Sequence, residues 1–390
     1  MTRTEALRLQ LDQIQRRSLL VGGLSLLLCL GGALFNPGQL FRSYLVAYLF
    51  WIGIPLGSIA ILMLHHLVGG AWGFVIRRLL ESAMGTLPVM VVLFLPLLFG
   101  MRDLYPWARP EEVANSEILR HKALYLNVPF FVIRAGVYFA VWMGLAFLLN
   151  KWSLDQERTT GSGPTRRLQI LSGPGLVVYG LTMTFASVDW VMSIEPEWFS
   201  TIFGISLIVG QALAGLAFAI PVAVLLADRE PLADVVIPAH LNDLGNLLLA
   251  FVMLWAYMAF SQFLIIWSGN LPEEIPWYVH RMRGGWSGIA VLVLLFYFAV
   301  PFLLLLSRGT KRRARILSAV AGAILLMRLV DLFWTVAPTF HPEGLRLHWL
   351  DLMAPIGVGG IWTGVFAWQL KGRSLLPLHD PYLKEAFHRE

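Results

Sequence analysis

The sequence predicts an all-α integral membrane protein, and its composition and patterning both support that fold class. Of its 390 residues, 57% are hydrophobic and 14% are charged, whereas a soluble domain is about half apolar and a quarter charged. The apolar residues gather in runs of about 20, the length that crosses a bilayer as a helix. Backbone groups in hydrocarbon must be paired within their own segment, so these runs are expected to form helices.

Ten runs meet this length and define the expected transmembrane helices. The first begins after Arg16 and Arg17 and superficially resembles a signal peptide. The "GGALFNPG" that follows has no convincing small-residue cleavage site, so we expect this run to be retained. Prolines inside the runs, such as Pro88 and Pro301, predict kinks. The ten runs cover residues 18–35, 43–66, 79–100, 127–149, 173–194, 199–226, 238–267, 284–306, 314–338 and 351–370.

The distribution of lysine and arginine orients the predicted helices. Twenty of these residues fall on the side that carries both ends of the chain and eight on the other, while two lie within the runs. Because cytoplasmic loops carry the excess of Lys and Arg, we expect a multi-pass protein with both termini cytoplasmic. In such a protein the net charge of +6 reflects topology and contact with anionic lipid, and it does not indicate a nucleic-acid partner.

Two pairs of similar segments indicate an internal duplication. The fifth run ends with "SVDWVMSIEP" and the ninth with "LVDLFWTVAP", so that Asp189 and Asp331 each precede a proline by seven residues. The third and seventh runs open with "ESAMGTL" and "LNDLGNL". Many transporters contain such duplications. We expect two four-helix bundles, at 43–194 and 199–338, flanked by the first and tenth helices, with a cytoplasmic tail at 371–390.

Ionisable side chains inside the runs mark candidate functional sites, because such residues in a membrane face a bundle interior or a water-filled cavity. They fall into two groups by depth. Those near the expected cytoplasmic ends are His65, His66, Glu81, His240 and Asp243. Those near the expected outer ends are Arg134, Asp189, Arg328 and Asp331.

The fifth run has the clearest geometry of the ten. Tyr179, Thr182, Ala186, Asp189 and Ser193 are three or four residues apart and therefore share one helix face. That face could order a file of waters leading to Asp189. It could equally be a seam of small and polar residues between packed helices, which membrane bundles use routinely.

The remaining candidates suggest an ion pair and a proton relay. Arg328 and Asp331 are three residues apart and can pair, either as a structural contact or as one that a moving proton opens. Glu81 could lie opposite Asp243 if the two repeats pack face to face. Buried carboxylates with shifted pKa values are what a proton relay requires. The proton-path candidates are Asp189, Asp331, Arg328, Glu81, Asp243, His65, His66 and Tyr179.

The chain offers little that would hold a cofactor. Cys29 is the single cysteine, which excludes an intrachain disulfide, an iron–sulfur cluster held by this chain's thiolates and a C-x-x-C-H haem attachment. His65 or His66 could match His240 in depth for a haem with two histidine ligands. All three lie at helix ends, however, where a solvated or capping histidine is the commoner arrangement. We expect this chain to bind no cofactor and no metal.

Two stretches carry a family resemblance. "VDWVMSIEPEWFST" and "LMLHHLVGGAWGFVIRRLLESAMGTLPV" resemble the F subunit of bacterial alternative complex III, a quinol:cytochrome c oxidoreductase, among the NrfD/PsrC-like membrane proteins. The resemblance implies two four-helix bundles in a bacterial inner membrane, with quinol in the complex and with haem c and iron–sulfur clusters in partner subunits. The implied partners are a C-type NrfD-like subunit, a multihaem cytochrome, an iron–sulfur subunit, small membrane subunits, a terminal cytochrome oxidase and lipids.

The leading functional hypothesis is therefore a membrane subunit of such a complex that carries no redox cofactor and provides a proton-conducting path. One alternative is an NrfD-like subunit that binds quinol itself, for which Asp189 and Tyr179 could supply the polar groups. Another is a purely structural scaffold of the complex. A stand-alone secondary transporter is less favoured, because broken helices and a midplane site are not evident in the sequence.

Overall fold

The computed structural model describes residues 3–158, 163–229, 232–234, 236–377, 380 and 383, and every regular element within these ranges is a helix. In the described part of the chain, nine helices are long and apolar enough to cross a membrane. A bent pair of shorter helices provides a tenth crossing when its two members count as one. The expected all-α fold with about ten transmembrane helices is confirmed.

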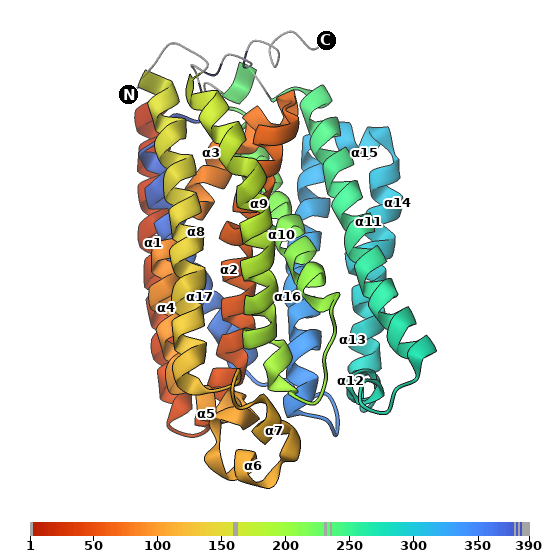
Figure 1. The fold of residues 1–390 in the computed structure, drawn as a ribbon. Helices are drawn as coiled ribbons and strands as arrows, with labels where there is room; N and C mark the ends of the chain where they lie inside the picture. The colour runs from red at the N-terminus through yellow and green to blue at the C-terminus, as the bar shows by residue number, and fades with distance from the viewer. Residues whose placement is uncertain are drawn as a thin grey trace.

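The crossing helices run roughly parallel to one another in a single layered bundle (Figure 1). They are α1 (Arg3–Ala33), α2 (Pro37–Val68), α3 (Ala71–Met84) with α4 (Leu87–Phe99), α8 (Val128–Arg158), α9 (Gly163–Trp190), α10 (Phe203–Leu226), α11 (Pro238–Gly269), α13 (Trp286–Val293) with the π-helix η4 (Leu294–Ala299) and α14 (Val300–Leu306), α16 (Ala314–Phe340) and α17 (Leu350–Lys371). The short connecting helices are α5 (Met101–Leu104), η1 (Pro106–Ala108), α6 (Pro110–Asn115), α7 (Glu117–Lys122), η2 (Met192–Ile194), η3 (Leu232–Asp234), α12 (Ile275–Met282) and α15 (Arg308–Arg312).

Helix α2 forms the centre of the molecule, since 94% of its most apolar window is buried. It crosses α10 where two glycines meet. A Cβ on Gly57 would lie 1.8 Å from the backbone oxygen of Gln211, and one on Gly215 would lie 2.9 Å from the carbonyl carbon of Gly57. Small residues at a crossing let helix backbones approach closely. This contact joins the two expected bundles, so the division at 43–194 and 199–338 stays a prediction.

Helices α1 and α17 pack against each other as an antiparallel pair. A Cβ on Gly360 would lie 2.5 Å from the Cα of Gly22, and Gly32 similarly faces the ring of Trp349. At the other end of the pair, the ammonium of Lys371 forms an ion pair with Asp12. The first and last crossings are therefore neighbours in space.

The third crossing differs from its prediction as one continuous helix over 79–100. Helix α3 starts earlier, at Ala71, and ends at Met84, and the axis bends by 43° before α4 begins at Leu87. Pro88 lies in the first turn of α4 and cannot donate the hydrogen bond that would continue α3. The side chain of Gln369 donates to the carbonyl of Gly85 at 2.8 Å, which satisfies a backbone group at the break. Broken helices, not evident in the sequence, are thus present.

The eighth crossing contains a π-helical segment, η4, between α13 and α14. Pro301 follows directly in the first turn of α14 and has no N–H to give to the preceding turn. The N–H of Val300 instead donates to Leu295, five residues back. Single π-turns inside α-helices occur frequently at functional sites.

The two ends of the bundle differ. Helix α1 begins and α17 ends at the same end, whereas α5, α6 and α7 project from the opposite end (Figure 1). Which of these ends faces the cytoplasm stays a prediction, as does the tail at 371–390, of which 378–379, 381–382 and 384–390 lie outside the described residues.

Candidate functional site

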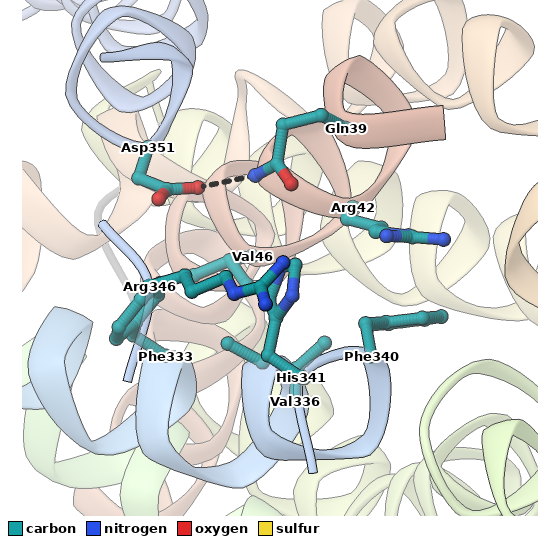
Figure 2. Close-up of a pocket in the computed structure, with 10 residues that line it drawn as sticks. Gln39, Arg42, Val46, Phe333, Val336, Phe340, His341, Arg346 and Asp351 are labelled. Atoms are coloured by element: carbon teal, nitrogen blue, oxygen red, sulfur yellow. Dashed lines mark hydrogen bonds between the residues drawn. The ribbon is translucent and has the colours of Figure 1, made fainter. Parts of the chain in front are cut away.

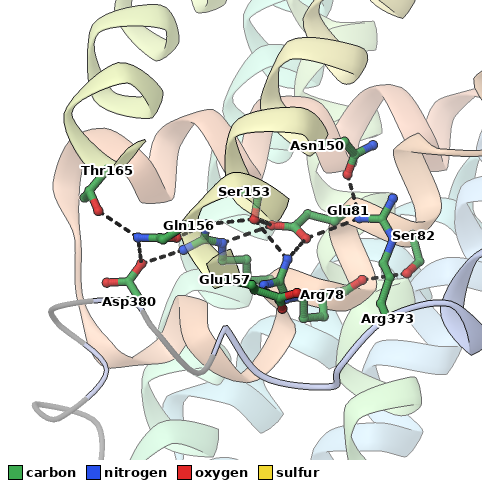
Figure 3. A network of polar contacts seen from close by, with 11 residues as sticks. Arg78, Glu81, Ser82, Asn150, Ser153, Gln156, Glu157, Thr165, Arg373 and Asp380 are labelled. Carbon is green, nitrogen blue, oxygen red and sulfur yellow. Dashed lines mark hydrogen bonds and ion pairs between the residues drawn. The ribbon is translucent and has the colours of Figure 1, made fainter. Parts of the chain in front are cut away.

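Glu81 lies at the centre of a buried charge network near the end of α3 (Figure 3). Its carboxylate, which is 0% exposed, forms ion pairs with Arg77 at 3.0 Å, Arg78 at 2.5 Å and Arg373 at 3.3 Å. The hydroxyl of Ser153 on α8 lies between the same groups and donates to Glu81. We call this set the arginine network. Three guanidinium groups and a hydroxyl hold Glu81 in place as an anion.

The arginine network extends to the segment after α17. Asp380 accepts a hydrogen bond from Arg77 at 2.6 Å, and Arg373 donates to Asn150 on α8 at 2.6 Å. Burial lowers the pKa of Arg373, and Glu81 counters part of that effect. The network therefore fastens the chain beyond α17 to α3 and α8.

Two points from the sequence bear on this network. Arg77 and Arg78 precede the third predicted run, which starts at residue 79, and both lie within α3 with 1% exposure. The ion pairs of Glu81 go to α3 and to the segment after α17, and a position of Glu81 opposite Asp243 stays a prediction. Asp243 lies half-buried near the start of α11.

His65 and His66 are buried at the end of α2 with their ring centres 5.7 Å apart. The ring of His65 packs edge-on against Trp72 and Phe74. Among the described residues, Nδ1 of His65 and Nε2 of His66 find no hydrogen-bond partner. The described part of the chain holds no cluster of three or more His, Cys, Asp or Glu side chains that could bind a metal. His240 is fully buried at the start of α11.

Asp189 is tied to α8 by a two-pronged ion pair. Arg134 donates from Nε at 2.8 Å and from Nη2 at 2.9 Å to its two carboxylate oxygens, and Tyr138 donates at 2.8 Å. The third nitrogen of the guanidinium donates to the carbonyl of Tyr125, whose ring lies 3.8 Å below it. Such paired geometry is the strongest form of an arginine–carboxylate contact. Asp189 is thus a fully engaged anion that joins α8 to α9.

The rest of the polar face of α9 is also occupied by contacts. Tyr179 donates to the side chain of Gln211 on α10 at 2.8 Å. The hydroxyl of Thr182 accepts from Trp142 on α8 at 3.0 Å, and Ser193 donates to the backbone of Asp189 at 2.6 Å. Each of these side chains already has a protein partner. The bonds therefore favour the interpretation of this face as a seam between packed helices, and they count against a file of waters.

Arg328 and Asp331 form the ion pair that their spacing predicts, with Nη1 and Oδ2 2.5 Å apart and both side chains buried. The guanidinium packs against Gly210 on α10, where an added Cβ would lie 2.4 Å from its central carbon. Tyr297, on the π-segment η4, is 0% exposed beside this pair, and its hydroxyl has no hydrogen-bond partner among the described residues. Its ring contacts Trp255 on α11, with centroids 4.4 Å apart. Four helices thus converge on one charged pair.

Glu195, in the turn after α9, forms a further tie between the two halves. It accepts from Arg281 on α12 at 3.0 Å and from Thr339 on α16. Burial lowers the pKa of Arg281 to about 10, with the neighbouring Glu195 acting in the opposite direction. The ring of Trp277 covers the guanidinium at 3.8 Å. The partner of Glu195 therefore comes from a loop in the second half of the chain.

A small pocket lies where α2 begins and α16 ends (Figure 2). Asp351 accepts hydrogen bonds there from Gln39 at 3.2 Å and from Ser43 at 2.6 Å. Burial lowers the pKa of His341, and the neighbouring cations of Arg42 and Arg346 lower it further while Asp351 acts against them. This corner of the molecule therefore disfavours a further positive charge on His341.

Several of these groups were missed or undervalued from the sequence. Arg134 was placed at the depth of Asp189 but not paired with it, although one arginine and one aspartate near the same end of consecutive helices are a readable signal. Tyr297 gave no signal, because a tyrosine in an apolar run is ordinary.

The protein is a multi-pass helical membrane protein with buried charge in both halves. In comparisons with known proteins, no family model and no curated protein matches the chain.

Proposed function

We propose that this chain is a membrane subunit, without a redox cofactor of its own, of a quinol-oxidising respiratory complex of the alternative complex III kind. Its place would be a bacterial inner membrane, with both termini cytoplasmic. The motif at 188–201 supports the family, and the buried ion pairs support a role in which charge is handled inside the membrane. Multihaem cytochrome and iron–sulfur subunits would carry the electrons.

The Arg328–Asp331 pair is the observation that carries a proton role for this subunit. Asp189 is held by three side-chain hydrogen bonds from α8, whereas Asp331 accepts one from Arg328 and has the side chain of Trp255 beside it. The pair also lies beside a buried tyrosine hydroxyl and a π-segment. Asp331 is therefore the carboxylate best placed to exchange a proton, and Asp189 is better suited to join helices.

The proposed step is a local exchange of partners. A proton that reaches Asp331 neutralises its carboxylate and leaves the buried guanidinium of Arg328 without its counter-charge, an arrangement that costs several kcal/mol. The hydroxyl oxygen of Tyr297 is adjacent and unsatisfied, so it can accept the released hydrogen bond from Arg328. When the proton leaves Asp331, the ion pair forms again. Quinol oxidation in a partner subunit would bias this exchange through the local potential.

Purification in mild detergent followed by partner identification tests the assignment to a complex. We expect multihaem cytochrome and iron–sulfur subunits to co-purify with the chain. A monodisperse single chain, recovered without partners under conditions that preserve other respiratory complexes, would count against it.

Proton release per electron in the intact complex tests the role of Asp331. We expect Asp331→Asn to lower this ratio while the complex stays assembled. The amide of asparagine cannot take up a proton, so the proton-driven opening and re-forming of the pair with Arg328 is lost. Asp189→Asn is the matched variant in the first half, and it should leave the ratio unchanged in whatever complex assembles. Equal ratios for the wild type and Asp331→Asn would leave a scaffold as the better description.

A further inference from the structure

An open groove runs along the surface between α1, α2 and α17, with a volume of about 320 Å³. The ring of Trp51 forms part of its floor, because it lies over Gly359, where an added Cβ would come within 2.2 Å. The indole N–H of Trp51 donates to the carbonyl of Pro355 at 2.8 Å. The polar atoms of the floor are thus paired, and the groove presents an apolar surface.

The groove has a polar end and an apolar end. Arg17 and Ser18 on α1 and Thr363 on α17 line the first, while Trp51 and Pro355 line the second. At 1.5 Å per residue, Thr363 and Pro355 are about 12 Å apart along α17. The polar end lies toward the terminus of α17 that Lys371 fastens to α1. A molecule with a polar head and an apolar chain would match this order.

Arg17 gives the groove its charge. Its side chain is exposed, and within the described residues it has no ion pair. Arg16 differs, because it lies near the carboxylate of Asp12, which also pairs with Lys371. An arginine that borders an apolar groove at the edge of a membrane helix can hold an anionic headgroup while the groove takes a chain.

We propose that this groove binds one acyl chain of a phospholipid whose phosphate is held by Arg17. The size of the groove favours a chain over a helix of a partner protein. A helix is about 10 Å across, so a 12 Å length of one occupies roughly 900 Å³, well above the volume of the groove. This binding is independent of the proton role of Asp331, which lies in the second half of the chain.

Native mass spectrometry of the full chain, released from nanodiscs that contain phosphatidylglycerol or phosphatidylcholine, tests the proposal. We expect one retained phospholipid per chain. Arg17→Gln should lower retention of either lipid about fivefold, the factor that corresponds to about 1 kcal/mol for one basic residue at a lipid surface. Val21→Trp, which fills the groove from α1, should abolish retention.

Arg16→Gln is the matched control, because it removes a neighbouring exposed arginine that does not line the groove, and it should leave retention unchanged. Excess inorganic phosphate should not displace the lipid, since the chain supplies part of the binding. Displacement by phosphate would identify a free-anion site instead and overturn the proposal, as would equal losses for Arg16→Gln and Arg17→Gln.

A photoreactive residue at Val21 that links to a polypeptide rather than to lipid would also overturn it. If Val21→Trp does not yield a monodisperse chain, Ile356→Trp fills the groove from α17 and is judged by the same outcome.

Discussion

The tie between Arg134 and Asp189 leads to a quantitative prediction. Arg134→Gln removes the guanidinium that donates twice to Asp189 and once to the carbonyl of Tyr125. Asp189, at 0% exposure, then keeps Tyr138 as its remaining side-chain donor. Removing one partner of a buried ion pair costs about 3–5 kcal/mol, which at about 2 °C per kcal/mol lowers the melting temperature by about 6–10 °C.

Thermal unfolding of the purified chain in detergent, followed by tryptophan fluorescence, measures this loss. A double variant, Arg134→Leu with Asp189→Leu, should recover most of the stability, because well-packed apolar residues replace a buried ion pair at little or no cost. Arg109→Gln removes a more exposed pair with Glu112 and should shift the melting temperature by no more than about 2 °C. If the double variant were as unstable as the two single changes combined, the uncompensated charge would not be the cause.

Two further predictions concern packing and pH. Gly57→Ala should destabilise the chain by about 1–3 kcal/mol in the same unfolding assay, because the new Cβ would lie 1.8 Å from the backbone oxygen of Gln211 and α2 must move away from α10. The melting temperature should fall as the pH drops through 6.5, because the pKa of His341 is lower in the folded chain and the unfolded chain therefore binds the proton first. His341→Gln should flatten that part of the pH profile.

Matched variants separate these effects from general damage. Gly136→Ala, on α8, adds a Cβ that meets no atom within 4 Å and should leave stability nearly unchanged. If it were as harmful as Gly57→Ala, close backbone approach would not be the reason. His121→Gln, at an exposed position on α7, should keep the wild-type pH profile. A profile for His341→Gln that matches the wild type would show that another group causes the acid sensitivity.

The sequence predicted the number of crossings and one of the ion pairs because both depend on local pattern. Apolar runs of about 20 residues identify helices, and the spacing of Arg328 and Asp331 places them on one face. The break in the third crossing could have been anticipated from "MGTLP", in which Gly85 and Pro88 interrupt the helix. The run was nevertheless apolar enough on average to be identified as one crossing, and hydropathy alone does not report a bend.

Contacts between distant segments were beyond the sequence, because they depend on how helices rotate and dock. Arg373 meets Glu81 across 292 residues of chain, and Asp380 meets Arg77 across 303. No periodicity specifies such pairs. The π-segment around Tyr297 also depends on packing, because a proline in a transmembrane helix can produce a kink, a break or a wider turn.

The pairing of α1 with α17 affects how this protein is made. Along the described chain α1 enters the membrane before α17, so the glycine face around Gly22 cannot pack against Gly360 until α17 has been inserted. The crossings between them fold while this face of α1 is open to lipid. Docking of α17 on α1 therefore joins two segments that are distant in the chain, and it follows the insertion of the helices between them.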